Sequence, residues 1–330
     1  MTGAAPTTRP ASGERPRVSV VVPNRNHEAF LPQRIESILA QTYRDIEVIV
    51  LDDASTDDSL GVLARYVDPP RVRVEYNAET SGNPFHQWRR GIASARGAYV
   101  WIAESDDYAD PRLLERLVAM LDAHPSMGLA YCAFWRVDER GVAEDMSGIW
   151  WRDLDRERWR HDFVAPGAEE LRWLSCWNVI SNASGVVFRR SVYDSVGGVD
   201  DSFRLAGDWD LWIRMARRSD VGFVAAPLNY WRWHGATVRV SAERTGLDRS
   251  EVERVLGDLA RSSGAAAEVL IANYHRRHAE SALRWRNAPL ARQHAVALLR
   301  RRPLAGASWR LVLQSGLLAA RAGLRVLRAT

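Results

Sequence analysis

Residues 17–53 read RVSVVVPNRNHEAFLPQRIESILAQTYRDIEVIVLDD. The β-branched run Val18–Val22 is stopped by a proline, a pattern typical of a buried strand. Apolar residues at helical spacing follow from about residue 29 to 41. A second apolar run, Ile46–Leu51, then ends in two aspartates. This order predicts a strand–helix–strand unit with parallel strands and a right-handed crossover.

The same alternation continues along the first half of the chain, and Ser55 with Asp58 is typical of a capping box that opens the next helix. The pattern predicts strands over 72–76 and 98–103 and helices over 87–95 and 111–123. It loosens from about residue 129, where strands are predicted over 129–135 and 184–189 and a helix over 208–217. After about residue 242 the chain is rich in Ala, Arg and Leu, which favours helices. The predicted class is α/β, with a mostly parallel, doubly wound, Rossmann-like sheet and a helical C-terminal extension.

Composition restricts the possible functions. The chain has 330 residues, a net charge of +4 and no lysine, so all of its fixed positive charge is arginine. Its two cysteines are too few for a disulfide scaffold, which predicts a reducing, cytoplasmic setting. No signal peptide or transmembrane segment is indicated, and residues 1–16 are predicted to be a disordered lead-in. The basic clusters lack the features of nucleic-acid binding, so no nucleic-acid partner is expected.

Acidic residues stand at the ends of predicted elements. The apolar run that begins at Trp101 ends in Asp106 and Asp107, and Asp52 and Asp53 follow an earlier strand. Strand ends of a doubly wound sheet meet at one crevice. A divalent cation, Mn²⁺ or Mg²⁺, would relieve the repulsion between adjacent carboxylates. The alternative interpretation is a solvated turn in which Asp110 caps the next helix.

Each acidic site can be given a chemical role. Asp53 can accept the imide N–H of a pyrimidine, and Asp107 can bind the metal through oxygen. Asp208, at the start of a later predicted helix, is the candidate base that takes a proton from an attacking hydroxyl. Asp210, two residues further on, is the alternative base. The two side chains point in different directions on a helix, so only one of them should face the acceptor.

The ordered motifs resemble glycosyltransferase family 2, whose members have the GT-A fold. The resemblance covers residues 17–240 and rests on VSVVVPNRN (18–26), SILAQTY (37–43), EVIVLDDASTD (47–57), RGIASARG (90–97), ESDD (104–107), VVFRR (186–190) and GDWDLW (207–212). The family often has tyrosine where Arg25 stands and glutamate where Gly207 stands.

The resemblance implies a role for each matching position. Donor-binding positions are Pro23, Asn24, Asn26, Asp52, Asp53 and Asp106; the metal position is Asp107, with His234 as a further candidate; the catalytic base is Asp208. The implied reaction moves a sugar from a nucleotide diphosphate to a hydroxyl group, with inversion at the anomeric carbon. The implied acceptor is a glycan or a lipid-linked precursor of a cell-surface polysaccharide.

The resemblance also implies a domain layout: a GT-A catalytic domain over 17–240, with a nucleotide-sugar half over 17–128 and an acceptor half over 129–240. Residues 241–330 form the helical C-terminal region. Its last helix has a leucine stripe beside an arginine stripe, which is typical either of a peripheral helix on the inner face of the membrane or of a helix packed on protein.

Several weaker hypotheses remain open. Arg232 and Arg239 are candidates for binding a diphosphate. Most of the 14 tryptophans are expected in the core, with one or two against an acceptor. Two other functions are also possible, a catalytically degenerate GT-A domain that acts as a binding scaffold and a nucleotidyltransferase.

Overall fold

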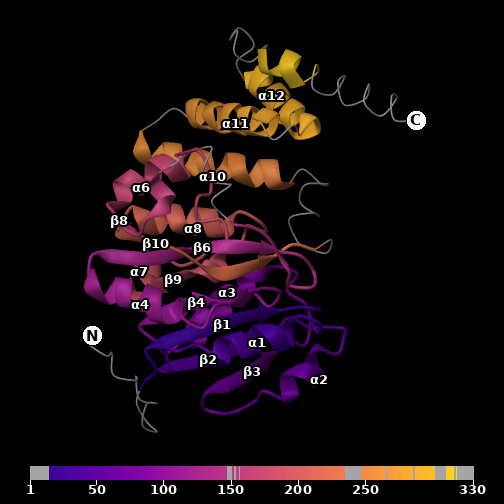
Figure 1. Cartoon of the computed structure of the whole chain (residues 1–330), viewed down its shortest axis with the longest axis vertical. Coiled ribbons are helices and arrows are strands. Elements are labelled where there is room, and N and C mark those ends of the chain that lie inside the picture. The colour runs from indigo at the N-terminus through magenta and orange to yellow at the C-terminus, as the bar shows by residue number, and fades with distance from the viewer. Residues whose placement is uncertain are drawn as a thin grey trace. The chain divides into compact units, whose positions relative to one another are not determined.

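The computed structural model describes residues 15–146, 151, 154–155, 157–234, 247–264, 267–284, 287–301, 310–315 and 317. The chain separates into two compact units, coloured in sequence order in Figure 1. The first comprises Met1–Leu171 with Val179–Asp248, and the second comprises Arg172–Asn178 with Arg249–Thr330. The layout with a boundary at residue 240 stays a prediction, and the lead-in over residues 1–14 lies outside the described residues.

The first half of the first unit is a parallel sheet with helical crossovers, as predicted. Its strands stand in the order β3-β2-β1-β4, with each neighbouring pair parallel. The strands are β1 (Val18–Asn24), β2 (Ile46–Asp52), β3 (Val72–Tyr76) and β4 (Tyr99–Ile102), and the helices between them are α1 (Leu31–Leu39), α2 (Ser59–Ala64) and α3 (Pro84–Ser94).

The alternation of side chains along β1 explains why helices cover both faces of this sheet. Val20 and Val22 point into a core that also contains Ile35 and Leu117, from α1 and α4 (Leu113–Ala123). Val21 points to the other face, where α3 packs so closely that a Cβ on Gly91 would clash with it. Every residue of β1 is buried, as expected for a strand between two helical layers.

The second half of the sheet is mixed, because β9 (Val186–Arg189) runs antiparallel to both β4 and β6 (Met127–Val137). β6 pairs in parallel with the long strand β10 (Asp220–Arg232), and these two strands lie side by side in Figure 1. Shorter strands complete the edge, namely β5 (Tyr108–Ala109), β7 (Ala143–Met146) and β8 (Phe163–Ala165). The remaining elements of this half are η1 (Arg158–Arg160), α6 (Gly167–Leu174), η2 (Ala183–Gly185), α7 (Arg190–Ser195) and α8 (Gly207–Ala216).

One local prediction is wrong. The Ser55–Asp58 capping box does not form, since α2 begins at Ser59. Ser55 instead bonds back to Asp52 through both its main-chain N and its Oγ, at 2.9 and 2.7 Å. The turn after β2 is therefore stabilised by hydrogen bonds to Asp52, the last residue of that strand.

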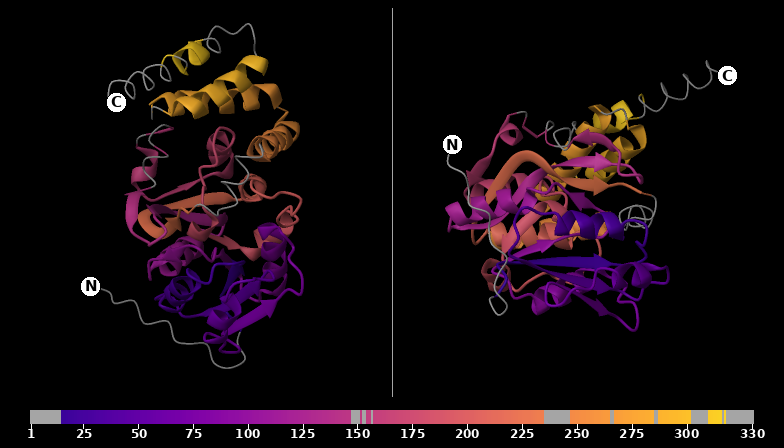
Figure 2. Two further views of the ribbon diagram at one scale, coloured as in Figure 1. Left: turned by 90° about the vertical axis from the view of Figure 1, so that its right-hand side faces the viewer. Right: turned by 60° about the horizontal axis from the view of Figure 1, so that its bottom comes forward.

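The second unit is helical, as predicted for the C-terminal region. It contains α10 (Leu247–Ser263), α11 (Ala267–Arg284) and α12 (Ala288–Arg301). α11 and α12 pack together, orange and yellow in Figure 2, around a core that includes Ala272, Ala279 and Leu298. Alanines at a helix–helix contact allow a close approach of the two backbones. No helix in the described part of the chain has the length and apolar character needed to cross a bilayer. The leucine and arginine stripes after residue 317 lie outside the described residues.

Candidate functional site

A cavity of about 440 Å³ opens where the first unit's strands end. Several predicted site residues line it, namely Pro23, Asn24, Asp53, Asp106, Asp107, Asp208 and His234. They come from the ends of β1, β2, β4 and β10 and from the start of α8. Carboxyl ends of neighbouring parallel strands meet at one edge of a sheet, which is why residues so far apart in sequence share this space.

Asn26 and Asp52 are predicted donor-binding residues that lie outside this cavity lining. Asp52 is 1 % exposed and accepts bonds from Asn24 Nδ2 at 2.8 Å and from Ser55. Asn26 has a positive φ of 56° and accepts a bond from Thr56 N at 2.7 Å. Both residues thus join the loop after β1 to the loop after β2.

Asp53 is surrounded by hydrogen-bond donors. Its Oδ1 accepts from Asn77 Nδ2, Ser81 N and Gln87 Nε2 at 2.6, 2.8 and 2.8 Å. Its Oδ2 accepts from Thr80 Oγ1, Ser81 Oγ and Gly82 N at 3.0, 2.9 and 3.2 Å. Burial acts to raise the pKa of Asp53, but the bonds from Ser81, Asn77 and Thr80 bring it below its usual value. An N–H of a bound base could reach this carboxylate only by displacing one of these donors.

The ESDD motif forms a buried acidic cluster. Burial and the charge of Asp106 raise the pKa of Glu104 to about 8 and that of Asp107 to about 6. Glu104 accepts a bond from Trp88 Nε1 at 2.8 Å. Asp107 accepts bonds from Arg232 N at 2.8 Å and from Asn182 Nδ2 at 3.1 Å. Two carboxylates that resist ionisation side by side form a cluster that gains from an added positive charge.

Arg34 of α1 supplies one such charge from behind the cluster. It is fully buried, and its Nε donates to the main-chain oxygen of Glu104 at 2.8 Å. Its guanidinium lies over the Trp101 ring, 5.2 Å from the centroid. Burial lowers the pKa of Arg34 to about 10, while the neighbouring carboxylates oppose that change. One guanidinium does not balance the three carboxyl groups of Glu104, Asp106 and Asp107, so a divalent cation would be favourable here.

The ligand atoms best placed for a metal belong to His27, Asp106 and His234, which all lie within 4.8 Å of one another. His234 Nε2 is 3.0 Å from Asp106 Oδ2, and His27 Nδ1 is 2.8 Å from Ser105 Oγ. Two imidazoles and one carboxylate are a donor set that fits Mn²⁺ and other divalent transition metals. The resemblance assigned the metal position to Asp107, with His234 as a further candidate. His234 does lie in this set, together with Asp106 and His27. Asp107 accepts bonds from Arg232 N and Asn182 Nδ2, and its metal role stays a prediction.

Arg232 serves a structural purpose. Its Nε donates to the Asp106 main-chain oxygen at 2.7 Å and its Nη2 to Gln33 Oε1 at 2.6 Å. Its Nη1 donates to the main-chain oxygens of Asp138 and Glu139. These contacts and its 2 % exposure are contrary to the hypothesis that it binds a diphosphate. Arg239 lies outside the described residues.

Asp208 and Asp210 have different surroundings although both stand in the first turn of α8. Asp210 is 7 % exposed and accepts bonds from Arg214 Nε and Nη2 at 2.8 and 2.7 Å. Asp208 lines the cavity, and its Oδ1 accepts a bond from Trp209 N at 2.6 Å. The helix therefore turns one carboxylate toward an arginine and the other toward the cavity.

Sequence reasoning missed His27, Glu104 and Arg34 as parts of this site. His27 stands three residues after the end of β1, in the loop that already held Asn24, so its place near a strand end was an available signal. The burial of Arg34 had no such signal, because an arginine on an amphipathic helix is usually exposed.

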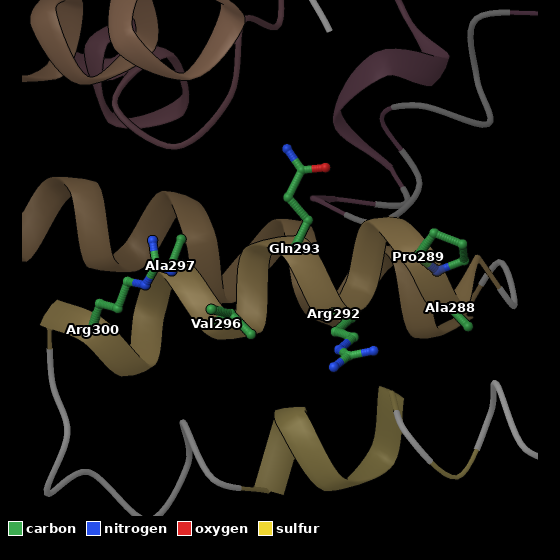
Figure 3. Close-up of a pocket in the computed structure, with 7 residues that line it drawn as sticks. All are labelled: Ala288, Pro289, Arg292, Gln293, Val296, Ala297 and Arg300. Carbon is green, nitrogen blue, oxygen red and sulfur yellow. The ribbon is translucent and has the colours of Figure 1, made fainter. Parts of the chain in front are cut away.

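A second hollow, of about 520 Å³, belongs to the helical unit. All seven residues drawn in Figure 3, from Ala288 to Arg300, come from α12. Its lining holds two arginines and neither carboxylate nor histidine. This surface therefore lacks the groups needed for metal binding or for general base catalysis.

Comparison with known proteins gives a family and a fold. The model of the family described as glycosyl transferase family 2 matches residues 19–197. Protein y4gI of Sinorhizobium fredii is 31% identical over 78% of this chain, and O-antigen biosynthesis protein RfbC of Myxococcus xanthus is 28% identical over 77%. The chain spans only 27% and 19% of the length of these two relatives.

Solved structures share the arrangement of elements. Residues 1–349 of S. aureus TarS in complex with UDP-GlcNAc superpose with a TM-score of 0.63 at 18% identity, covering 93% of this chain and 92% of that one. The mannosyltransferase PcManGT of Pyrobaculum calidifontis, in complex with GDP-Man and Mn²⁺, gives a TM-score of 0.56 at 19% identity, covering 98% and 84%. At such identities the likeness shows the fold.

Proposed function

The chain belongs to glycosyltransferase family 2 and has the GT-A fold, and from this premise we propose that it transfers a sugar from a nucleotide diphosphate to a hydroxyl group with inversion at the anomeric carbon. The observation that supports this proposal best is that one cavity holds both the His27–Asp106–His234 set and Asp208. The first can hold a metal beside the donor's phosphates, and the second is a carboxylate that lines the same cavity and can take a proton from a hydroxyl.

The proposed step is a single displacement. Asp208 takes the proton of the acceptor hydroxyl, and the acceptor oxygen forms a bond to the anomeric carbon. The bond from that carbon to the phosphate oxygen breaks, and the nucleoside diphosphate leaves with the electron pair. A Mn²⁺ or Mg²⁺ held by Asp106, His27 and His234 would supply positive charge for the leaving diphosphate. The ion pair of Asp210 with Arg214 supports Asp208 over Asp210 as the proposed base.

The donor side of the cavity is proposed to lie around Pro23 and Asn24, with Asp53 and the loop over residues 77–83 beside them. Relatives with this fold include structures with UDP-GlcNAc and with GDP-Man and Mn²⁺, so uridine and guanosine nucleotides are the first to test. The proposed acceptor is a glycan or lipid-linked precursor in polysaccharide synthesis. The similarity to RfbC, which is named as an O-antigen biosynthesis protein, supports this class.

The proposed location is the cytoplasm, with peripheral contact at the inner face of the membrane through the last helix. The amphipathic leucine and arginine stripes of the sequence support this part of the proposal. Co-sedimentation with anionic vesicles tests it, with the full chain and a form that lacks residues 305–330 compared side by side. Equal binding of both forms would contradict it.

The deciding experiment is calorimetric titration with UDP, GDP and dTDP, each with Mn²⁺ and with EDTA. Metal-dependent binding of one nucleotide is expected, and it would name the donor class. Nucleotide release from the matching nucleotide sugar should then be lost in Asp208→Asn and retained in the matched variant Asp210→Asn. Binding without turnover in the wild-type chain would favour the alternative of a degenerate binding scaffold.

A further inference from the structure

Two tryptophans at the end of β10 line the candidate cavity. Trp231 and Trp233 stand on either side of Arg232, directly before His234 of the metal set. Trp233 is 37% exposed, although most large apolar side chains of this unit are buried. An exposed indole inside a cavity is an apolar surface that a ligand can cover.

The ring of Trp233 is held in place by its surroundings. Its main-chain N donates to Val137 O at 2.9 Å, which continues the pairing of β10 with β6. The rings of Trp233 and Trp231 meet edge to face, 5.4 Å apart at 67°. The guanidinium of Arg136 lies over the Trp233 ring, 5.3 Å from its centroid. A large aromatic face that is already ordered loses little conformational entropy when a ligand binds.

The place of this pair in the sheet separates it from the predicted nucleoside side. Asp53 follows β2, and Pro23 lies in β1, two adjacent strands. In the sheet order β3-β2-β1-β4-β9-β6-β10, three strands stand between β1 and β10. The metal set combines His27 from the loop after β1, Asp106 from the loop after β4 and His234, which directly follows Trp233. A donor that spans from the nucleoside side to the metal thus leaves the tryptophan side for the second substrate.

We propose that Trp233, supported by Trp231 and Arg136, is the platform on which a sugar ring of the acceptor stacks. The C–H face of a pyranose covers apolar aromatic surface, and its hydroxyls reach polar groups at the rim. Asp208 lines the same cavity and is such a group. The inference rests on the proposed function, and it names a carbohydrate subsite which that function leaves open.

The test uses the full chain and simple sugars as probes. Methyl glycosides of glucose, N-acetylglucosamine, galactose and mannose, each at millimolar concentration, are examined by saturation-transfer NMR with and without UDP or GDP and Mn²⁺. At least one glycoside should receive saturation on the protons of one ring face. Trp233→Ala should reduce that signal by roughly fivefold or more, while Trp233→Phe retains part of it, as expected for the loss of one aromatic contact.

The control is Tyr76→Ala, since Tyr76 is 50% exposed on β3 and does not line the cavity. Its glycoside signal should equal that of the wild type. Nucleotide affinity, measured by calorimetry, should be unchanged in Trp233→Ala. Weaker nucleotide binding with an unchanged glycoside signal would mean that Trp233 stacks on the donor base, and it would overturn the inference.

The two proposals can fail separately. Nucleotide binding without any glycoside signal would refute the acceptor platform and leave the transferase function standing. A glycoside signal that depends on Trp233 in a chain that binds no nucleotide would support the platform and refute the donor site.

Discussion

Replacing Asp53 with asparagine tests whether this carboxylate organises the donor loop. Six hydrogen bonds from residues 77–87 converge on its two oxygens. In Asp53→Asn the amide oxygen keeps three of them, without the charge. Ser81 and Thr80 can rotate their hydroxyls to accept from the new amide N–H₂, but the Gly82 N–H would face a donor.

The magnitude follows from these contacts. A hydrogen bond to a charged group contributes about 1.5–3 kcal/mol and a neutral one about 0.5–1.5 kcal/mol, so each retained bond weakens by about 1 kcal/mol. Three such bonds predict a fall of about 3 kcal/mol in the free energy of unfolding. The Gly82 N–H keeps its bond to Thr80 Oγ1, at 3.0 Å, so it adds little to this loss. Urea denaturation at neutral pH measures it. The matched control is Asp58→Asn, because Asp58 is exposed and lies in the same loop after β2 as Asp53. This control substitution should change stability by less than about 0.5 kcal/mol.

Nucleotide binding distinguishes two roles of Asp53, which are stabilising the loop over residues 77–87 and hydrogen-bonding the base of the nucleotide. If Asp53 acts through the loop, Asp53→Asn should weaken UDP, GDP and dTDP to a similar degree, and the wild type should tolerate UDP methylated at N3. The reasoning is refuted if Asp53→Asn is as stable as the wild type and loses affinity for one nucleotide only. That result would instead establish the base contact predicted from the sequence.

Three further outcomes are expected. Asp208→Asn should lower kcat by about 10²–10⁴-fold, the usual contribution of a general base, whereas Asp210→Asn should mainly lower stability; equal losses of kcat would contradict the assignment. His27→Ala should weaken Mn²⁺ binding to the nucleotide-free protein by at least about tenfold, measured by calorimetry, and an unchanged affinity would remove His27 from the metal set. Burial lowers the pKa of His278 to about 3, with the charge of His275 acting in the same direction against a bond to the Tyr274 carbonyl. The unfolded chain therefore binds this proton first as pH falls below about 6.5. The contribution of His278 to stability should decrease by about 2 kcal/mol between pH 7 and pH 5, and the difference in unfolding free energy between the wild type and His278→Phe at the two pH values measures it. The NMR signals of the His278 ring should not titrate in this range, and a shift with an ordinary pKa would oppose the prediction.

The His278 prediction concerns a group enclosed by rings within the helical unit. Trp177 stacks on it with centroids 3.8 Å apart, and the rings of Tyr274 and His294 lie at 3.9 and 5.0 Å. These rings bury the imidazole, and burial is the main cause of its lowered pKa. None of them offers a negative charge that would oppose this effect.

The amino-acid sequence by itself determined the parallel half of the fold and the positions of its acids. The valines of β1 alternate between two faces, and the acids follow β2 and β4, because strand period and strand termination are local properties of the chain. The αβ order then brings the strand ends to one edge, which predicts that Asp53 and Asp106 lie in one site. Asp208 was added to that site by the family resemblance, because it stands at the start of a helix.

The tertiary structure alone decided which residues those acids contact. His234 reaches Asp106 across 128 positions of sequence, and this contact depends on β9 entering antiparallel between β4 and β6, which no local pattern indicated. Asp107 is turned to Asn182 and Arg232 by the same pairing, and Arg34 is buried by the packing of α1 over the acidic strand end. Local residue patterns specify the backbone dihedral angles and which face of a strand or helix is buried. Which distant side chains contact one another depends on strand order and packing, and these are established only when the whole sheet forms.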